Sequence, residues 1–153
     1  MKVLKPPARP GIASVERVVF LAGSIEMGVA EDWQTKLTAA LADRDVTICN
    51  PRRDDWDASW KQTIDDPQFN EQVTWELDHL DRANVIAMWF DPMTKSPITL
   101  LELGLYARGQ RVIVGCPPGF WRRGNLEVVC ARFGIPLFAD WHGFVEEVRV
   151  RVT

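Results

Sequence analysis

Short apolar runs alternate with segments of helical periodicity five times along this chain, and the alternation restricts the folds open to it. The runs are largely uninterrupted by polar residues, which is typical of strands buried on both faces of a parallel sheet. Strands that alternate with helices predict a five-stranded parallel sheet with helices on both faces, an α/β fold. The expected strands are 18–22, 46–49, 84–90, 111–114 and 135–138, and the expected helices are 33–41, 69–82, 98–108, 125–133 and 141–150.

The 153 residues are enough for one ordinary domain. Residues 1–14 contain three prolines, which interrupt backbone hydrogen bonding, so we expect a flexible N-terminal lead there and a single domain over 15–153. The polar stretch 52–67 is long for a loop inside a compact domain, and such loops are often lids or binding loops. The sequence leaves open whether this stretch is a lid or an interface.

The overall charge excludes several classes of partner. A formal net charge of -3 argues against a general nucleic-acid or anionic-membrane binder, since both need a basic face. No run reaches the roughly 20 apolar residues of a membrane-spanning helix, and we expect a cytoplasmic protein. The three cysteines lack a CxxC pair, which favours buried free thiols. The two histidines lack the spacing of metal ligands, so no metal is expected.

In a parallel sheet, ligands bind at the carboxyl ends of the strands, so polar residues after strands are candidates. Gly23 and Ser24 follow the first strand, where a small turn lets backbone amides approach a phosphate or sugar. Relief of backbone strain explains the glycine equally well. Asn50, Arg52 and Arg53 follow the second strand, and the arginines are suited either to an anionic ligand or to a solvated charge cluster.

Glu102 is the strongest candidate for chemistry. It is the only charged residue between Lys95 and Arg108, and leucines surround it in an expected helix. Burial of a carboxylate costs several kcal/mol unless the group is paired or used, which indicates a functional acid. The alternative is a surface glutamate whose neighbours happen to be apolar on both sides.

A second acidic group lies upstream, on the helix before the third strand. Glu76 and His79 share one face of that helix, and Asp78 and Asp81 lie on another. Two acidic groups at one site allow one carboxylate to act as a nucleophile while the second group handles a proton. An acid on this helix is expected to reach the same site as Glu102.

Several motifs occur in a recognisable order. The first strand ends in FLAGS, the second is followed by CNPRRDDW, and the third is preceded by FNEQVTWELDHLDRAN. The third strand ends in WF, and the helix SPITLLELG follows it. Together these motifs resemble the nucleoside 2-deoxyribosyltransferase-like family, over about residues 18–115.

The resemblance implies a flavodoxin-like, or Rossmann-like, three-layer sandwich that cleaves or exchanges the bond between (deoxy)ribose and a base. Glu102 matches the glutamate that attacks the anomeric carbon and forms a covalent glycosyl ester. Ser96 matches a residue that touches the sugar or phosphate, and Gly23 with Ser24 matches the loop beside the sugar. The acid that handles the proton of the base falls on Glu76, with Asp78 as the second choice.

The resemblance also bears on substrate and assembly. Ser96 replaces the aspartate of the transferases, which resembles the branch that hydrolyses nucleoside 5'-monophosphates, where Arg52 and Arg53 would suit the phosphate. Transfer and hydrolysis both remain open. The chemistry needs no cofactor. Family members are dimers or larger in which a neighbouring loop often completes the site, so a homo-oligomer is expected, with the Trp121 region and Asn125 as the candidate contributors from the neighbour.

Two other functions remain open from the sequence. One is a phosphoribohydrolase of the lysine-decarboxylase-like class, although the Pro-Gly-Gly-x-Gly-Thr loop typical of that class is missing. The other is a non-catalytic nucleotide-binding or sensor domain in which Glu102 only contacts a ribose hydroxyl. Release of free base distinguishes an enzyme from a binding domain.

Overall fold

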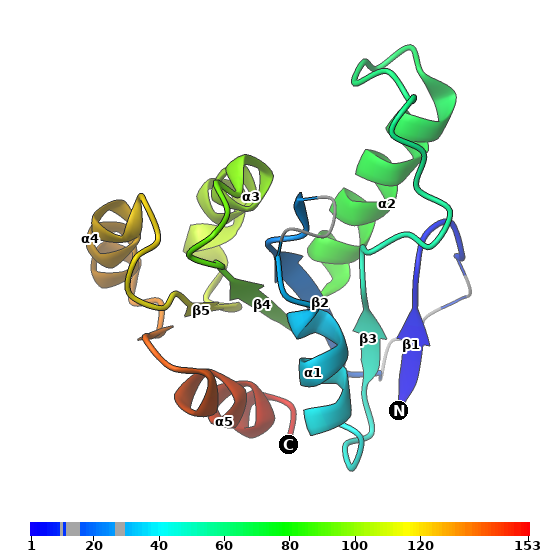
Figure 1. The fold of residues 1–153 in the computed structure, drawn as a ribbon. Helices are drawn as coiled ribbons and strands as arrows, with labels where there is room; N and C mark the ends of the chain where they lie inside the picture. The colour runs from blue at the N-terminus through cyan, green and yellow to red at the C-terminus, as the bar shows by residue number, and fades with distance from the viewer. Residues whose placement is uncertain (10, 12–15, 27–29) are drawn as a thin grey trace.

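The fold is a parallel α/β sandwich, seen in a computed structural model that describes residues 1–9, 11, 16–26 and 30–153. A single sheet of six parallel strands has the order β1-β3-β2-β4-β5-β6, and helices cover it (Figure 1). The strands are β1 (Lys2–Leu4), β2 (Val18–Gly23), β3 (Thr47–Cys49), β4 (Val85–Trp89), β5 (Val112–Gly115) and β6 (Leu137–Phe138). The helices are α1 (Trp33–Ala40), α2 (Pro67–Arg82), α3 (Pro97–Tyr106), the 3-10 turn η2 (Ala107–Gly109), α4 (Arg123–Phe133) and α5 (Trp141–Arg151).

The parallel sheet is confirmed, but the prediction of five strands is wrong by one. The additional strand, β1, lies within the expected N-terminal lead and pairs with the edge of β3, with Lys2 opposite Thr47 and Leu4 opposite Cys49. Three residues are too few to show a periodic pattern in the sequence. The strand is recognised only in the structure, where it pairs with the outer edge of β3. Of the expected lead, residues 10 and 12–14 lie outside the described part of the chain.

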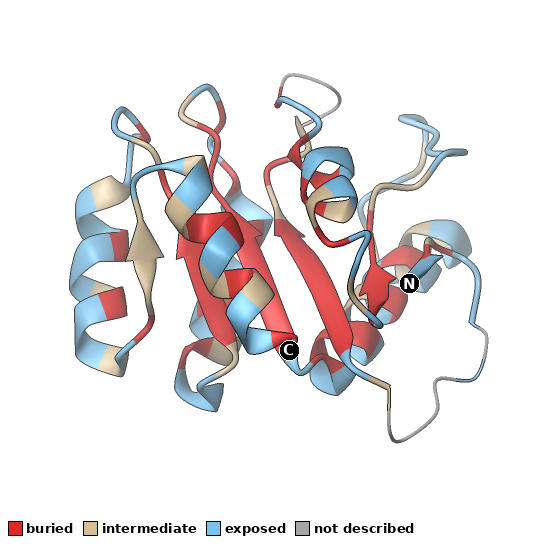
Figure 2. Ribbon diagram, turned by 90° about the horizontal axis from the view of Figure 1, so that it is seen from below, coloured by how far each residue is buried: buried red, intermediate tan, exposed pale blue. Residues whose placement is uncertain are grey.

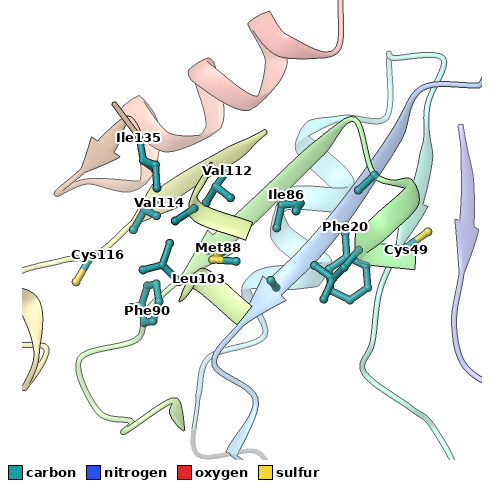
Figure 3. Packing of buried hydrophobic residues seen from close by; sticks show 14 of the residues in the cluster. Phe20, Cys49, Ile86, Met88, Phe90, Leu103, Val112, Val114, Cys116 and Ile135 are labelled. Atoms are coloured by element: carbon teal, nitrogen blue, oxygen red, sulfur yellow. The ribbon is translucent and has the colours of Figure 1, made fainter. Parts of the chain in front are cut away.

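The sheet separates two apolar cores because successive side chains of a strand point to opposite faces. Phe20 belongs to the core beneath α2, α3 and α4, and its neighbour Leu21 belongs to the core beneath α1 and α5. Figure 2 shows the central strands as buried along almost their whole length. Figure 3 shows Phe20, Met88 and Leu103 within the first core, where α3 packs on the sheet.

The first residues of α2 and α3 determine where these two helices, which carry Glu76 and Glu102, begin. The Asp66 side chain caps α2 by accepting from the backbone N–H groups of Gln68 and Phe69, which with Pro67 explains why α2 begins earlier than the predicted residue 69. Helix α3 begins at Pro97, and Ser96 before it has left-handed backbone angles, φ 48° and ψ 51°.

The strand order has one switch point. From β2 the chain crosses to β3 on one side and then returns to β4 on the other side, so β2 and β4 are neighbours. Apart from the added β1, this is the flavodoxin order, in which ligands bind at the carboxyl ends of the two strands beside the switch. Ser24 follows β2 at this edge, and residues 90–96 follow β4. Among the residues described here, no helix is both long enough and apolar enough to cross a membrane.

Candidate active site

Three buried hydroxyl groups meet at the switch point. The Ser24 hydroxyl oxygen lies 2.8 Å from Thr94 Oγ1 and 2.5 Å from Ser96 Oγ, and the latter two are 2.8 Å apart. The Asp91 backbone N–H donates to Ser24 Oγ at 2.9 Å, and the Thr94 hydroxyl donates to the Asp91 carbonyl at 2.9 Å. The structure thus brings the predicted residues Ser24 and Ser96 together, through a threonine that sequence reasoning missed.

The loop after β2 is joined to the start of α3 by Glu26. Its Oε1 atom accepts from the backbone N–H groups of Lys95, at 2.6 Å, and Ser96, at 2.5 Å. Both Glu26 and Ser96 have positive φ, 34° and 48°, which is uncommon for residues other than glycine. Gly23 has a steric role, because an added Cβ would lie 2.5 Å from the Trp89 carbonyl oxygen.

Glu102 is buried, whereas apolar neighbours on the same helix are not. Its exposed fraction is 8%, compared with 59% for Ile98, 60% for Leu101 and 58% for Leu105. The glutamate therefore lies on the inner side of α3, and the alternative of a surface glutamate among apolar neighbours is wrong. Within the described part of the chain, its carboxylate has no hydrogen-bond partner.

Glu102 and Glu76 interact across the space between α3 and α2. Burial, and then the charge of Glu76, raises the pKa of Glu102 to about 8. Burial also raises the pKa of Glu76, against a hydrogen bond of 2.8 Å from Gln72 Nε2, which lowers it. A charge on one carboxyl group disfavours a charge on the other, so the pair favours holding one proton between the two groups. The charge of Glu76 thus acts on Glu102, and the catalytic roles of the two groups stay predictions.

The other acidic and hydroxyl candidates on these helices have different partners. Asp78 is exposed and forms an ion pair with Arg9, at 2.5 Å. The Tyr106 hydroxyl, one helical turn after Glu102, donates to Asp81 Oδ1 at 2.7 Å and not to Glu102. The Ser96 hydroxyl likewise makes no contact with Glu102 and lies against Ser24 and Thr94.

The polar residues after β3 are held mainly by protein groups. The Arg53 guanidinium donates to Asp55 at 2.7 Å and to Glu71 at 3.1 Å, and its side chain is only 5% exposed. Arg52 contacts the Gln34 side-chain oxygen at 3.5 Å, and its backbone N–H donates to the buried Asn50 at 3.0 Å. Asn125 is exposed in the first turn of α4, after β5.

The raised pKa of Glu102 predicts a pH-dependent cost in stability. Between the ordinary value of 4.5 and about 8, the folded protein holds a proton that the unfolded chain has lost, so rising pH destabilises the fold. We expect the free energy of unfolding of the wild type, relative to Glu102→Gln, to fall by at least about 1 kcal/mol between about pH 4.5 and pH 9. Denaturant unfolding at several pH values measures this difference, and a constant difference would contradict the assigned burial.

The fold and the site together define a flavodoxin-like α/β protein with three buried hydroxyl groups at its switch point and a buried glutamate, Glu102, that interacts with Glu76. A family model described as nucleoside 2-deoxyribosyltransferase like matches residues 16–120, which confirms the resemblance seen in the motifs. The chain belongs to the nucleoside 2-deoxyribosyltransferase-like family. No curated protein matches the chain.

Proposed function

We propose that this protein is an enzyme that cleaves or exchanges the N-glycosidic bond of (deoxy)nucleosides or their 5'-monophosphates through a covalent glycosyl–Glu102 intermediate. The observation that carries the proposal is the Glu102 carboxylate, which is buried, without a hydrogen-bond partner among the described residues, and next to Glu76. A carboxylate free of hydrogen bonds keeps its lone pairs available for attack on carbon.

The first step forms one bond and breaks another at the anomeric carbon. The ionised Glu102 carboxylate attacks this carbon, and the electron pair of the C–N bond passes to the nitrogen of the base. Glu76, in its protonated form, gives its proton to the departing base, so the base leaves neutral. Burial raises the pKa of both carboxyl groups, so the pair favours holding one proton, and the attack requires this proton to lie on Glu76 while Glu102 is ionised.

The second step restores the enzyme. A water molecule or a second base attacks the anomeric carbon of the glycosyl ester, and the bond to the Glu102 oxygen breaks. Glu76, now ionised, takes the proton that the attacking group loses. Two displacements on opposite faces return the sugar to its original configuration, as in retaining glycosidases. Hydrolysis and transfer differ only in the group that attacks.

The sugar end of the site supports a substrate with a free 5'-hydroxyl rather than a 5'-phosphate. The two backbone N–H groups before α3, which would suit a phosphate, donate to the Glu26 carboxylate. The guanidinium of Arg53 is already shared between Asp55 and Glu71. A 5'-phosphate would have to displace a carboxylate from these groups, and the two are both negatively charged. A neutral 5'-hydroxyl group would not have to displace it.

Release of free base from matched nucleosides and 5'-monophosphates tests the function. We expect the wild type to act faster on the nucleosides, and Glu26→Ala to reduce this preference by about tenfold, because the two N–H groups become available to phosphate. A wild type that prefers monophosphates would contradict the argument on the 5'-hydroxyl. A raised melting temperature with ligand, but no released base, would favour the binding-domain alternative.

Helix α3 supports the expectation of a homo-oligomer. Ile98, Leu101 and Leu105 recur on one helix face and are exposed, and Met93 before the helix is 79% exposed. Contiguous exposed apolar side chains of this kind mark interaction sites. We propose that a second copy covers this face. In that assembly, the exposed Asn125 after β5 is available to complete the neighbouring site.

The apolar face of α3 gives a direct test of assembly. We expect Leu101→Asp to shift the protein from oligomer to monomer in sedimentation velocity, because a charge would be buried in the interface. Val150→Asp, an equally exposed position on the opposite face of the sheet, is the matched control and is expected to leave the assembly unchanged. A monomeric wild type would contradict the proposal.

The unpaired cysteines support a location in a reducing compartment such as the cytoplasm. All three, Cys49, Cys116 and Cys130, are free and buried. Burial raises the pKa of each thiol, which makes these groups unreactive. We therefore assign them to the cores and not to the reaction.

A further inference from the structure

Gln72 connects the proposed acid to the sheet. It lies on α2 one turn before Glu76 and is 5% exposed. Its Nε2 atom donates to Glu76 Oε1 at 2.8 Å and to the Pro51 carbonyl oxygen at 3.0 Å. The Pro51 carbonyl can only accept, so the amide nitrogen must face Pro51 and Glu76, and the orientation of the side-chain amide is fixed.

The other end of this amide is unsatisfied. Gln72 Oε1 is buried and has no hydrogen-bond partner among the described residues. A buried acceptor without a partner costs stability, and an apolar side chain of the same length would avoid that cost. The oxygen of the amide therefore does not stabilise the fold. Gln72 contributes through its nitrogen, which makes two hydrogen bonds.

We propose that Gln72 is a positioning residue that orients the Glu76 carboxyl group for proton donation to the departing base. The inference rests on the proposed function, since it assigns Gln72 to the same reaction. Because Nε2 engages Oε1 of Glu76, the other carboxyl oxygen, Oε2, is left to carry the proton. The contact with Pro51, directly after β3, keeps the amide in one place relative to the sheet.

Among the described residues, Gln72 is the side chain that forms a hydrogen bond with the Glu76 carboxyl group. The charged group that acts on Glu102 is Glu76, on the facing helix, and no basic side chain among the described residues offsets the two carboxylates. The Tyr106 hydroxyl, the other titratable group near Glu102, is bonded to Asp81. A hydrogen bond to the carbonyl oxygen of a carboxylic acid also makes the acid a better proton donor.

The experiment compares Gln72→Met with Gln68→Met, an exposed glutamine one turn earlier on the same helix. Two substrates distinguish a loss of acid catalysis from a general distortion of the active site, because only one of them needs a proton on its leaving base. An ordinary purine nucleoside needs protonation of its base, whereas its N7-methylated form carries a positive charge and releases a neutral base without a proton. We expect Gln72→Met to lose about ten- to a hundredfold in rate on the ordinary nucleoside and little on the methylated one.

A second measurement does not depend on turnover. Carbon-13 NMR titration of the glutamate carboxyl groups is expected to show Glu76 titrating at higher pH in Gln72→Met, because the hydrogen bond that stabilises its ionised form is lost. An unchanged Glu76 titration, equal losses on both substrates, or the same loss in Gln68→Met would overturn the inference. A wild type that releases no base would instead overturn the proposed function, while the titration still tests Gln72.

Discussion

Replacement of Glu102 by glutamine is expected to lower the release of free base by roughly four orders of magnitude or more. The amide is a poor nucleophile and cannot form the glycosyl ester, although it nearly preserves the size and shape of the buried side chain. Removal of a carboxyl group that is buried without a hydrogen-bond partner should leave the fold intact. Chromatography of the free base, with circular dichroism of the variant, measures the loss.

The control for this variant is Glu146→Gln, on α5 across the sheet from the site. Glu146 is exposed and lies 4.0 Å from Arg149, in a surface ion pair of small energetic weight. We expect this control to keep the wild-type rate. If Glu102→Gln retained a rate similar to that of the control, the assignment of the nucleophile would be wrong.

Replacement of Glu76 by glutamine is expected to lower the rate on ordinary nucleosides by about 100- to 1000-fold, the range of a general acid. In the proposed mechanism the half-buried Glu76 carboxyl group supplies the proton of the departing base, and an amide has none to give at neutral pH. A purine nucleoside methylated at N7 should be cleaved almost as fast as by the wild type, because its base leaves without protonation. Rates on the two substrates measure the effect.

The same measurement decides between the two candidate acids of α2, Glu76 and Asp78. Asp78 is exposed and bound to Arg9, whereas Glu76 interacts with Glu102. Loss of activity in Asp78→Asn and retention in Glu76→Gln would assign the acid to Asp78. Equal losses on both substrates in Glu76→Gln would show that Glu76 shapes the site without donating a proton.

The fold could be predicted to the extent that it is periodic. The buried strands β2 and β4 are continuous apolar runs, so their place in a parallel sheet follows from the sequence alone. Strand β1 could not be predicted, because three residues at an edge gain their structure from pairing with β3 and not from a pattern of their own. Helix α2 begins two residues before the predicted residue 69, because its N-cap, Asp66, lies in the polar stretch that shows no helical pattern.

The site was predictable where one residue contrasts with its neighbours. Glu102 is unusual among leucines, and that contrast indicated burial correctly. Apolar character alone would not have shown which side of α3 faces the sheet, since Leu101 and Leu105 are exposed and Glu102 is buried. The position of Thr94, two residues before Ser96, was only a weak indication that it belongs to the site. The contacts of Glu26 and of Gln72 could not be predicted from spacing, because they depend on how loops and helices pack in the tertiary structure.

The arginines after β3 show a further limit of sequence reasoning. Arg53 was a candidate for an anionic ligand, and the structure shows its guanidinium between Asp55 and Glu71. Asp55 is close in the sequence, but Glu71 belongs to α2 and its distance could not be known beforehand. A charged side chain can be identified from the sequence, whereas the identity of its partner depends on the tertiary structure.

The most direct test of the covalent mechanism is mass spectrometry of the enzyme quenched in acid during turnover of a deoxynucleoside. We predict that the peptide that carries Glu102 gains the mass of one deoxyribosyl group in the wild type, and that Glu102→Gln gains none. Rapid release of base with no such adduct on any peptide, at every quench time, would contradict a glycosyl–Glu102 intermediate.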